Sequence, residues 1–533
     1  MMTTITISRQ EWRWLLLWSF LIVLITSLPA LLAWARTPTD MVYTGQVLSP
    51  ADGNTYLNKI KQGAAGQWLF SIGYTSEPHE PIFLHPYYIT LGHLARLVNL
   101  PLNVTFQLFR ALNSWLLLIT VYWFIAIFWP EPAKRQLTFF FVALSAGMGW
   151  LFIFFDVATT DLKVPESVTF LTMLVNPHFP LATAFVILSL AGGMLALHRR
   201  SWVYATLCGL SQTVLLFLHP YDIVITGATL AAYFALGLWR HWWSWPTVGY
   251  LSLSGLICLP AFWHNLKLYT LTGVWRLWQT QAPPPTPLLI TFILGYGFLL
   301  ILAAIGGYAL FRQDGLASSS PAQILILWIV GVFIIMFAPI PPLEAIQVRF
   351  SEGLHIPIAI LAAHGLWVFL ARKRGQIALQ TKVWLPILIF LSLSNLLTLS
   401  SAIWRVSTPE APWFYTQDEV AVMRWLDAHS QPDDIVLTLN WTGNYLPAQA
   451  NIHVYVGHLY ETIDYKKKVE RSEAFFANHL SEAEARAFLR NNRIDWLFIG
   501  QQEAATPFQP ETKPYLTQAF AQGDSAVYRV NLP

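Results

Sequence analysis

The chain is poor in charged residues. Asp, Glu, Lys and Arg make up only 11% of its 533 residues, whereas an ordinary soluble domain has roughly 25%. Hydrophobic residues make up 55% of the chain, and tryptophan occurs 25 times. This shortage of charge excludes an ordinary soluble protein and indicates an integral membrane protein.

Cysteine and nucleotide-binding motifs are also scarce. The two cysteines, Cys208 and Cys258, both lie within apolar runs, so neither a disulfide framework nor a cysteine-based metal site is expected. The sequence has no GxxxxGK[ST] motif and no GxGxxG between a strand and a helix. We expect no nucleic-acid partner.

Long apolar runs, by contrast, are abundant. The first, at residues 12–34, is long enough to cross a hydrocarbon core of about 30 Å, and no signal-peptide cleavage site follows it. The divisions at residues 219–222 and 339–342 could also be kinks or re-entrant elements. Hydropathy predicts a polytopic α-helical fold with about 11 transmembrane helices, at residues 12–34, 106–129, 137–155, 179–197, 202–218, 223–239, 247–263, 287–311, 324–338, 353–370 and 383–403.

The loops between these helices alternate in basic charge. One set is rich in Lys and Arg, for example at Lys134, Arg135, Arg199 and Arg200, and the positive-inside rule assigns that set to the cytoplasm. We therefore expect a protein of the plasma (inner) membrane with a cytoplasmic N-terminus and its unusual polar residues on the extracytoplasmic side. Chemistry on that side disfavours an enzyme that uses ATP or a nucleotide sugar.

The chain is predicted to have two domains. The first, residues 1–403, contains the spans and a long first external loop at residues 35–105. The second, residues 404–533, is extracytoplasmic, and its apolar patterns predict a small α/β unit with a largely parallel sheet. Strands are predicted at residues 434–439, 453–456, 494–499 and 526–530, and helices at residues 418–429 and 473–492. The stretches NWTGNYLPA and VYVGHLYETIDYKKK are interpreted as loops after strands.

The first external loop carries a lone carboxylate, Asp52, within LSPADGNTYLNKIKQGAAG. Tyr56, Leu57 and Ile60 follow it at helical spacing, which predicts an amphipathic helix with Asp52 close to its N-terminus. A second amphipathic segment, FLHPYYITLGHLARLVNL, follows and is typical of a helix in the membrane interface. The simpler interpretation of Asp52 is a turn residue in a solvated loop.

Other polar residues lie at the predicted external ends of the spans. Arg349 and His355 are candidate ligands of a donor phosphate, because a guanidinium matches phosphate oxygens bidentately. A structural salt bridge of Arg349 with Glu344 or Glu352, and helix-end roles for the histidines, are the alternatives. The candidate substrate or metal ligands are Asp156, Asp161, His178, His219 and Asp222.

Several motifs together resemble the GT-C superfamily of membrane glycosyltransferases, in particular an uncharacterised bacterial branch. These are DGNTYLNKIKQGAAGQWLF, YTSEP, NPHFPLA, LHPYD, QVRFSEGLHIPIAILAAHGL and VYVGH..ET. The resemblance implies a hexosyltransferase that moves a sugar from a polyprenyl-phosphate-linked donor, a membrane lipid, to a glycan, lipid or protein acceptor on the outer face. It implies an inverting reaction in which Asp52 is the catalytic base.

The sequence departs from the superfamily pattern in two respects. Asp52 has no neighbouring acid, and Asp156 and Asp161 do not form a tight D-x-D pair. Mg²⁺ or Mn²⁺ is therefore only a candidate cofactor, and its ligands stay unassigned. Two other functions compete with the enzyme: a noncatalytic GT-C-like lipid-binding or scaffold protein, and a transporter, which would usually show internal repeats.

Overall fold

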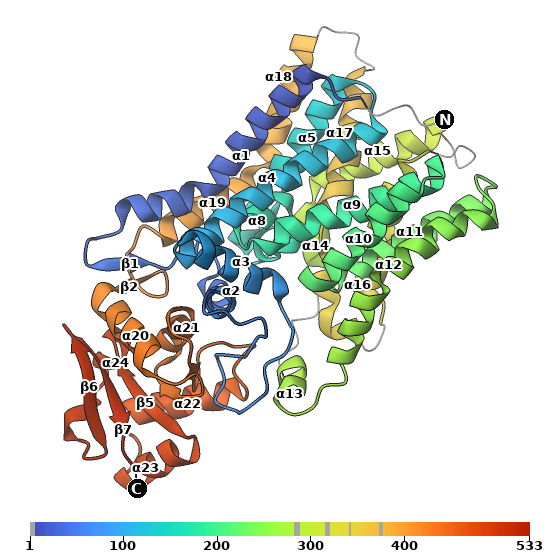
Figure 1. The fold of residues 1–533 in the computed structure, drawn as a ribbon. Coiled ribbons are helices and arrows are strands. Elements are labelled where there is room, and N and C mark those ends of the chain that lie inside the picture. Colours follow the sequence, from blue (N-terminus) through green and yellow to red (C-terminus); the bar gives the residue numbers. More distant parts are fainter. Residues whose placement is uncertain (1–5, 282–287, 315–319, 340–342, 372–376, 533) are drawn as a thin grey trace. The chain divides into compact units, whose positions relative to one another are not determined.

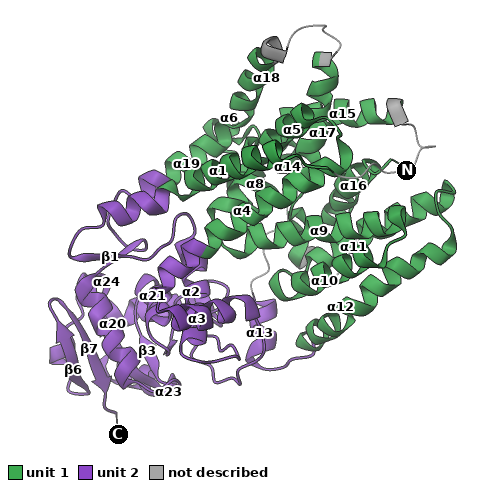
Figure 2. Ribbon diagram, turned by 45° about the horizontal axis from the view of Figure 1, so that its top comes forward, with its two compact units in different colours: residues 1–28, 109–268, 284–402 green, residues 29–108, 269–283, 403–533 purple. Residues whose placement is uncertain are grey.

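The computed structural model describes residues 6–281, 288–314, 320–339, 343–371 and 377–532 (Figure 1). Its contacts divide the chain into two compact units (Figure 2). Unit 1 contains residues 1–28, 109–268 and 284–402, and unit 2 contains residues 29–108, 269–283 and 403–533.

Unit 1 is built from helices. Its main elements are α1 (Arg9–Arg36, which continues into unit 2), α4 (Leu102–Phe128), α5 (Pro132–Leu144), α6 (Gly149–Phe152), α7 (Thr160–Lys163), α8 (Thr169–Leu174), α9 (His178–Arg199), α10 (Trp202–Leu218), α11 (Asp222–Trp239), α12 (Val248–Leu268), α14 (Leu289–Tyr296), α15 (Phe298–Asp314), α16 (Gln323–Phe337), the 3-10 helix η4 (Leu343–Ser351), α17 (His355–Ala371), α18 (Ile377–Leu391) and α19 (Leu393–Arg405).

All eleven predicted apolar segments are helical, and the protein is a multi-pass membrane protein. Among the described residues, seven helical segments are long and apolar enough to cross a membrane, and two bent helix pairs bring the number to nine. The two remaining segments, α10 and α16, are shorter apolar helices. Helices satisfy their own backbone hydrogen bonds, which is why they can cross a hydrocarbon core.

Three predicted spans are interrupted, which the hydropathy pattern did not indicate. Residues 287–311 form α14 and α15, which meet at 81° where Gly297 adopts a positive φ of 45°. Helices α18 and α19 meet at 49°. In the segment at 137–155, α5 ends at Leu144, and helix resumes only at Gly149 with α6. A hydropathy window averages over such breaks and therefore misses them.

Close packing of helices in unit 1 depends on small residues. A Cβ at Gly306 of α15 would lie 1.9 Å from the carbonyl oxygen of Leu361 in α17, and one at Gly365 would lie 2.5 Å from the carbonyl oxygen of Leu302. Small residues allow helix backbones to approach in this way inside a membrane.

Unit 2 joins the first loop to the C-terminal segment. Its elements are β1 (Met41–Tyr43), α2 (Pro50–Ala64), α3 (Pro86–Val98), α13 (Val274–Thr280), β2 (Phe414–Thr416), α20 (Gln417–His429), β3 (Ile435–Leu437), α21 (Asn440–Gln449), β4 (His453–Val454), α22 (Tyr465–Phe476), α23 (Glu482–Asn491), β5 (Ile494–Ile499), α24 (Gln501–Ala504), β6 (Leu516–Gln522) and β7 (Ser525–Val530). Strands β1 and β2 pair antiparallel and so connect the two ends of the unit.

The C-terminal sheet has five strands in the order β4-β3-β5-β7-β6. Strands β4, β3 and β5 are parallel, as predicted, but β7 and β6 are antiparallel to their neighbours. Phe475, Phe476 and Phe488 of α22 and α23 pack against one face with Leu497. On the other face, Trp425 of α20 packs against Trp496 at 5.9 Å between ring centroids.

The four predicted strands and the first predicted helix are confirmed, but two local predictions are wrong and one strand was missed. The stretch NWTGNYLPA forms α21 instead of a loop. The predicted helix at 473–492 is two helices, because Ser481 caps the start of α23 with a capping box. Strand β6 was missed, since most of its side chains are exposed and give no apolar alternation.

Candidate functional site

Asp52 lies in the first turn of α2, as predicted. The Ser49 hydroxyl donates a hydrogen bond of 2.8 Å to one carboxylate oxygen, and Nε2 of His458 lies 3.2 Å from the other. The side chain of Asp52 is nevertheless 45% exposed. The carboxylate is therefore oriented by two partners while remaining accessible to a substrate.

His458 lies in the turn after β4 and is buried. Because a carboxylate can only accept, the ring must carry a proton on Nε2 to bond Asp52. The backbone N–H groups of Gly457 and His458 donate to the Thr462 hydroxyl, which donates to the carbonyl of Tyr74 at 2.7 Å. Within the described residues, Nδ1 of His458 has no hydrogen-bond partner. The surrounding backbone thus positions this ring against Asp52.

A buried ion pair joins the same two segments a second time. Lys59 Nζ lies 2.7 Å from Glu461, and the two side chains are only 1% and 8% exposed. Lys59 follows Asp52 by about two helical turns, so both lie on the same side of α2. Glu461 follows His458 closely in the segment after β4. Lys59 also lies 4.9 Å from the ring centroid of Phe70, where a cation is favourable.

Asparagines complete the contact of α2 with α21. Asn54 donates to the side-chain oxygen of Asn444 at 2.8 Å, and Asn58 donates to the carbonyl of Pro447 at 2.8 Å. The Asn444 amide donates in turn to the carbonyls of Ala51 and Gly457. Buried polar groups of this kind specify one packing arrangement, because each misplacement would leave a donor or acceptor unsatisfied.

These contacts bring together motifs that lie far apart in the sequence. DGNTYLNK supplies Asp52 and Lys59, and VYVGH..ET supplies His458 and Glu461. YTSEP contributes Glu77, whose carboxylate lies 2.7 Å from Lys468. Burial lowers the pKa of Lys468, and the nearby Glu77 opposes that change.

Sequence reasoning did not identify His458 as the partner of Asp52, nor Lys59 and Glu461 as an ion pair. The available signal was that all three lie inside motifs already noted for the resemblance. The motifs did not reveal which of them meet.

A second polar cluster lies within unit 1. His219 Nδ1 is 3.0 Å from Asp222, and the His178 ring is 6.4 Å from that of His219. The guanidinium of Arg349 lies 5.5 Å from the ring centroid of Tyr221 and interacts electrostatically with Asp222. The motifs NPHFPLA, LHPYD and QVRFSEG therefore converge on one region of unit 1.

Glu352 is a second deeply buried acid of this cluster, at 1% exposure. One of its oxygens accepts a hydrogen bond from the Thr183 hydroxyl, and Asp222 interacts with it electrostatically. Within the described part of the chain, the second carboxylate oxygens of Glu352 and Asp222 and Nε2 of His219 have no partner. The side chain of Glu344 lies outside the described residues.

The remaining candidates have different surroundings. His355 is buried, with Nδ1 2.9 Å from the Thr169 hydroxyl and Nε2 3.2 Å from that of Ser145. Asp161 is buried and accepts hydrogen bonds from the Gly149 amide and the Thr159 hydroxyl. Asp156 is exposed, with a φ of 58°. His355 and Asp161 thus have their polar atoms bonded within the protein.

The metal expectation was tested against these positions. Among the described residues, no group of three or more His, Cys, Asp or Glu side chains has a geometry that could hold a metal ion. Asp156 is exposed, whereas both carboxylate oxygens of Asp161 accept hydrogen bonds within the protein. These residues do not fit a Mg²⁺ or Mn²⁺ site, and no step is assigned to a metal.

The architecture has counterparts among solved membrane glycosyltransferase structures. One is an oligosaccharyltransferase from Archaeoglobus fulgidus tethered to an acceptor peptide, with a TM-score of 0.54 and 12% identity, covering 90% of this chain and 69% of that one. Another is ArnT from Cupriavidus metallidurans bound to undecaprenyl phosphate, with a TM-score of 0.53 and 12% identity, covering 96% of this chain and 98% of that one. The chain has the GT-C fold.

A mycobacterial arabinofuranosyltransferase, AftD, is similar as well. Its TM-score is 0.55 at 14% identity, and the match covers 99% of this chain but only 40% of AftD. No protein-family model and no curated protein sequence matches the chain. The GT-C resemblance found in the sequence motifs is therefore confirmed by the fold.

Proposed function

We propose that the protein is a GT-C-type hexosyltransferase that moves a sugar from a polyprenyl-phosphate-linked donor to an acceptor on the extracytoplasmic face of the plasma membrane. The similar ArnT structure binds undecaprenyl phosphate, and the similar oligosaccharyltransferase holds an acceptor peptide. A lipid-linked donor also suits a chain whose described part includes seven to nine helical segments able to span a membrane. The basic loops support a cytoplasmic N-terminus.

The observation that carries this proposal is the half-exposed carboxylate of Asp52 held between Ser49 and His458. In the proposed reaction, Asp52 takes the proton from an acceptor hydroxyl. The acceptor oxygen forms a bond to the anomeric carbon as the carbon–phosphate-oxygen bond breaks. The phosphate leaves with the bonding electron pair, and the anomeric configuration is inverted.

His458 is proposed as a positioning residue, because its Nε2–H fixes the orientation of the Asp52 carboxylate. A His458→Gln variant should lower kcat more than it changes KM, and it should shift the acid limb of the pH–rate profile. A stability role alone would reduce the amount of folded protein without moving that limb. The measurement is a pH–rate profile of both proteins.

Arg349 is proposed independently as a ligand of the donor phosphate. Arg349 is partly accessible, and its guanidinium could donate two hydrogen bonds to phosphate oxygens. Arg349→Lys keeps the charge but loses the fork geometry, so donor binding should weaken by roughly tenfold. Unchanged donor affinity in this variant would remove Arg349 from the proposal.

The decisive experiment uses the full-length protein in proteoliposomes with a panel of radiolabelled polyprenyl-phosphate sugars. Wild type, Asp52→Asn and Asp524→Asn are compared, the last being an exposed aspartate in the β6–β7 turn of the same unit. Sugar release or transfer by wild type and Asp524→Asn, but not by Asp52→Asn, is the expected result.

The other outcomes distinguish the competing functions. Donor binding without turnover in the wild type would favour a noncatalytic lipid-binding or scaffold protein. Absence of binding to every donor would favour a transporter. Transfer that persists in Asp52→Asn would show an enzyme with a different base.

A further inference from the structure

The C-terminal sheet of unit 2 has a cleft that the proposed reaction does not use. Strands β3 and β5 are neighbours in the sheet, but the chain leaves them in opposite directions. After β3 it continues to β4, at one edge of the sheet, and after β5 it continues to β6 and β7, toward the other edge. Adjacent parallel strands whose connections diverge in this way leave a crevice outside their carboxyl ends, where open α/β sheets bind ligands. The cleft there has a volume of about 420 Å³, which is the size of a small-molecule site.

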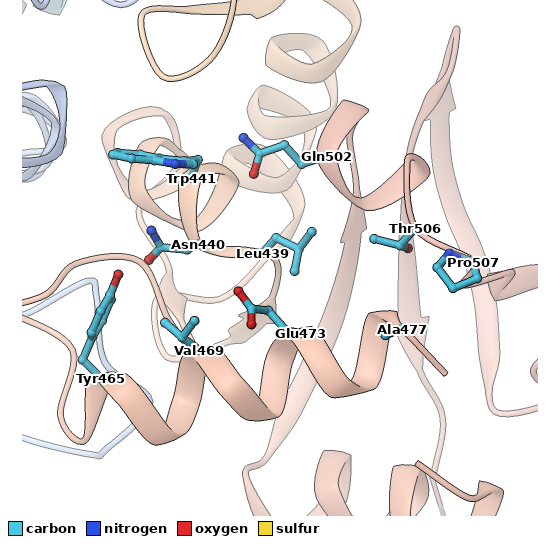
Figure 3. Close-up of a pocket in the computed structure, with 10 residues that line it drawn as sticks. All are labelled: Leu439, Asn440, Trp441, Tyr465, Val469, Glu473, Ala477, Gln502, Thr506 and Pro507. Atoms are coloured by element: carbon cyan, nitrogen blue, oxygen red, sulfur yellow. The ribbon is translucent and has the colours of Figure 1, made fainter. Parts of the chain in front are cut away.

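Three segments form the walls of the cleft. They are the start of α21 after β3, α24 and the residues that follow it after β5, and helix α22. Figure 3 shows Trp441 and Gln502 on one side and Glu473 of α22 on the other. The lining residues are Leu439, Asn440, Trp441, Tyr465, Val469, Glu473, Ala477, Gln502, Thr506 and Pro507.

A buried acid of α24, Glu503, holds the first two of these segments together. One carboxylate oxygen of Glu503 accepts a hydrogen bond from the Leu439 amide at 2.7 Å, and the other accepts from the Thr442 hydroxyl and the Gly500 amide at 3.1 Å. The cleft is therefore built on a rigid connection between β3 and β5.

The lining indicates the chemistry of the ligand. None of its ten described residues is Lys, Arg or His, so it offers no cation to an anionic ligand. Trp441 is 37% exposed and provides an aromatic surface. Amide, carboxylate and hydroxyl groups accompany it, and the Tyr465 hydroxyl points toward Asn440 (Figure 3). An aromatic surface beside several hydrogen-bonding groups matches the apolar face and the hydroxyl edge of a sugar ring.

We propose that this cleft is a saccharide-binding site for neutral or amino sugars. The sugar ring packs on Trp441, and its hydroxyl groups bond Asn440 and Gln502. Glu473 accepts from a hydroxyl or from an ammonium group. The site would hold a saccharide on the C-terminal domain without taking part in the reaction assigned to Asp52.

The test measures binding, so it does not depend on catalysis. Full-length protein in nanodiscs is titrated with glucose, galactose, mannose, glucosamine and glucose 6-phosphate, and binding is followed by saturation-transfer NMR. At least one neutral hexose or glucosamine should bind, whereas glucose 6-phosphate should not. Asp52→Asn should bind equally well, which separates this site from the proposed reaction.

Variants locate the binding. Trp441→Ala should weaken it about tenfold, whereas Trp441→Phe should retain most of it. Glu473→Gln should weaken glucosamine binding more than hexose binding. Trp68→Ala is the control, since Trp68 is an exposed tryptophan of the same unit that lies outside the cleft.

Trp441→Ala should fold, because the Tyr415 hydroxyl donates its hydrogen bond to the backbone carbonyl of Trp441. The substitution leaves that carbonyl in place. The proposal is overturned if none of the uncharged or amino sugars binds, if glucose 6-phosphate binds best, or if both Trp441→Ala and Glu473→Gln bind as well as wild type.

Discussion

Two aspartate–histidine pairs among the described residues differ in almost every respect except chemistry. In unit 1, Asp222 and His219 are three residues apart in the chain, and both side chains are nearly inaccessible. In unit 2, Asp52 and His458 are 406 residues apart, and nearly half of the Asp52 side chain is exposed. The same pair of groups is thus a buried local structure in one unit and an accessible long-range contact in the other.

This difference indicates which pair is suited to chemistry. A general base must reach a substrate hydroxyl, which Asp52 can do. Asp222 instead is nearly inaccessible and is the partner of the equally buried His219, so its removal would leave a buried ring nitrogen unpaired, which has a cost in stability. We therefore expect substitutions at Asp52 to affect activity and substitutions at Asp222 to affect folding.

The largest expected effect is the loss of activity in Asp52→Asn. Removal of a general base typically lowers the rate by about 10² to 10⁴-fold, and the exposed side chain should cost less than about 1 kcal/mol of stability. Transfer rate and thermal unfolding are measured on the same preparation. A large loss of stability with normal sugar transfer would contradict the expectation that Asp52 acts in the reaction and not in folding.

The next largest effect is expected at Lys59, which supports the long-range pair. Lys59→Met leaves Glu461 buried and unpaired, so stability should fall by about 3–5 kcal/mol. The measure is thermal unfolding together with hydrogen exchange in α2.

Two variants serve as controls for Lys59→Met. Lys61→Met breaks the more exposed pair with Asp427 on the same helix and should cost at most about 1 kcal/mol. Adding Glu461→Gln to Lys59→Met should recover much of the lost stability. Equal losses in Lys59→Met and Lys61→Met would contradict the role of burial.

Glu503 provides a buried carboxylate in unit 2 for comparison with Asp222. Burial raises the pKa of Glu503 from 4.5 to about 7. The folded state therefore binds this proton more tightly than the unfolded state does. The stabilisation of the fold by protonated Glu503 is complete below about pH 4.5 and is lost as the pH rises through about 7. Since one pKa unit corresponds to about 1.4 kcal/mol, the difference between the two pKa values corresponds to about 3 kcal/mol of unfolding free energy.

The measurement for Glu503 is hydrogen exchange of β3 and β5 amides between pH 5 and 8, corrected for intrinsic exchange rates. Glu503→Gln should reduce this pH dependence, and the exposed Glu470→Gln should leave it unchanged. A pH dependence that persists in Glu503→Gln would assign it to another group.

The smallest effect is expected for Asp222→Ala. It leaves Nδ1 of the buried His219 without its carboxylate partner, so stability should fall by about 1–3 kcal/mol. Asp52→Ala, matched in chemistry, should change stability less because of its exposure. Thermal unfolding in nanodiscs compares the two, and an equal loss in both would remove the distinction between the pairs.

Local features of the structure were largely predictable. The eleven apolar segments, the helix that carries Asp52 and four strands of the sheet follow from hydrophobic periodicity, which depends on neighbours within a few residues. The breaks at Gly297 and Ser481 were missed because a single residue decides them. The helix at NWTGNYLPA was missed because its composition is typical of a turn.

The sequence by itself determined the membrane class, the GT-C resemblance and the position of Asp52 at the start of a helix. Only the tertiary structure decided that His458 meets Asp52, that Glu461 meets Lys59, and that β3 and β5 leave a cleft between their turns. Hydrophobic patterns act over one or two helical turns, whereas these contacts depend on how distant segments pack. Motif residues alone did not specify that packing.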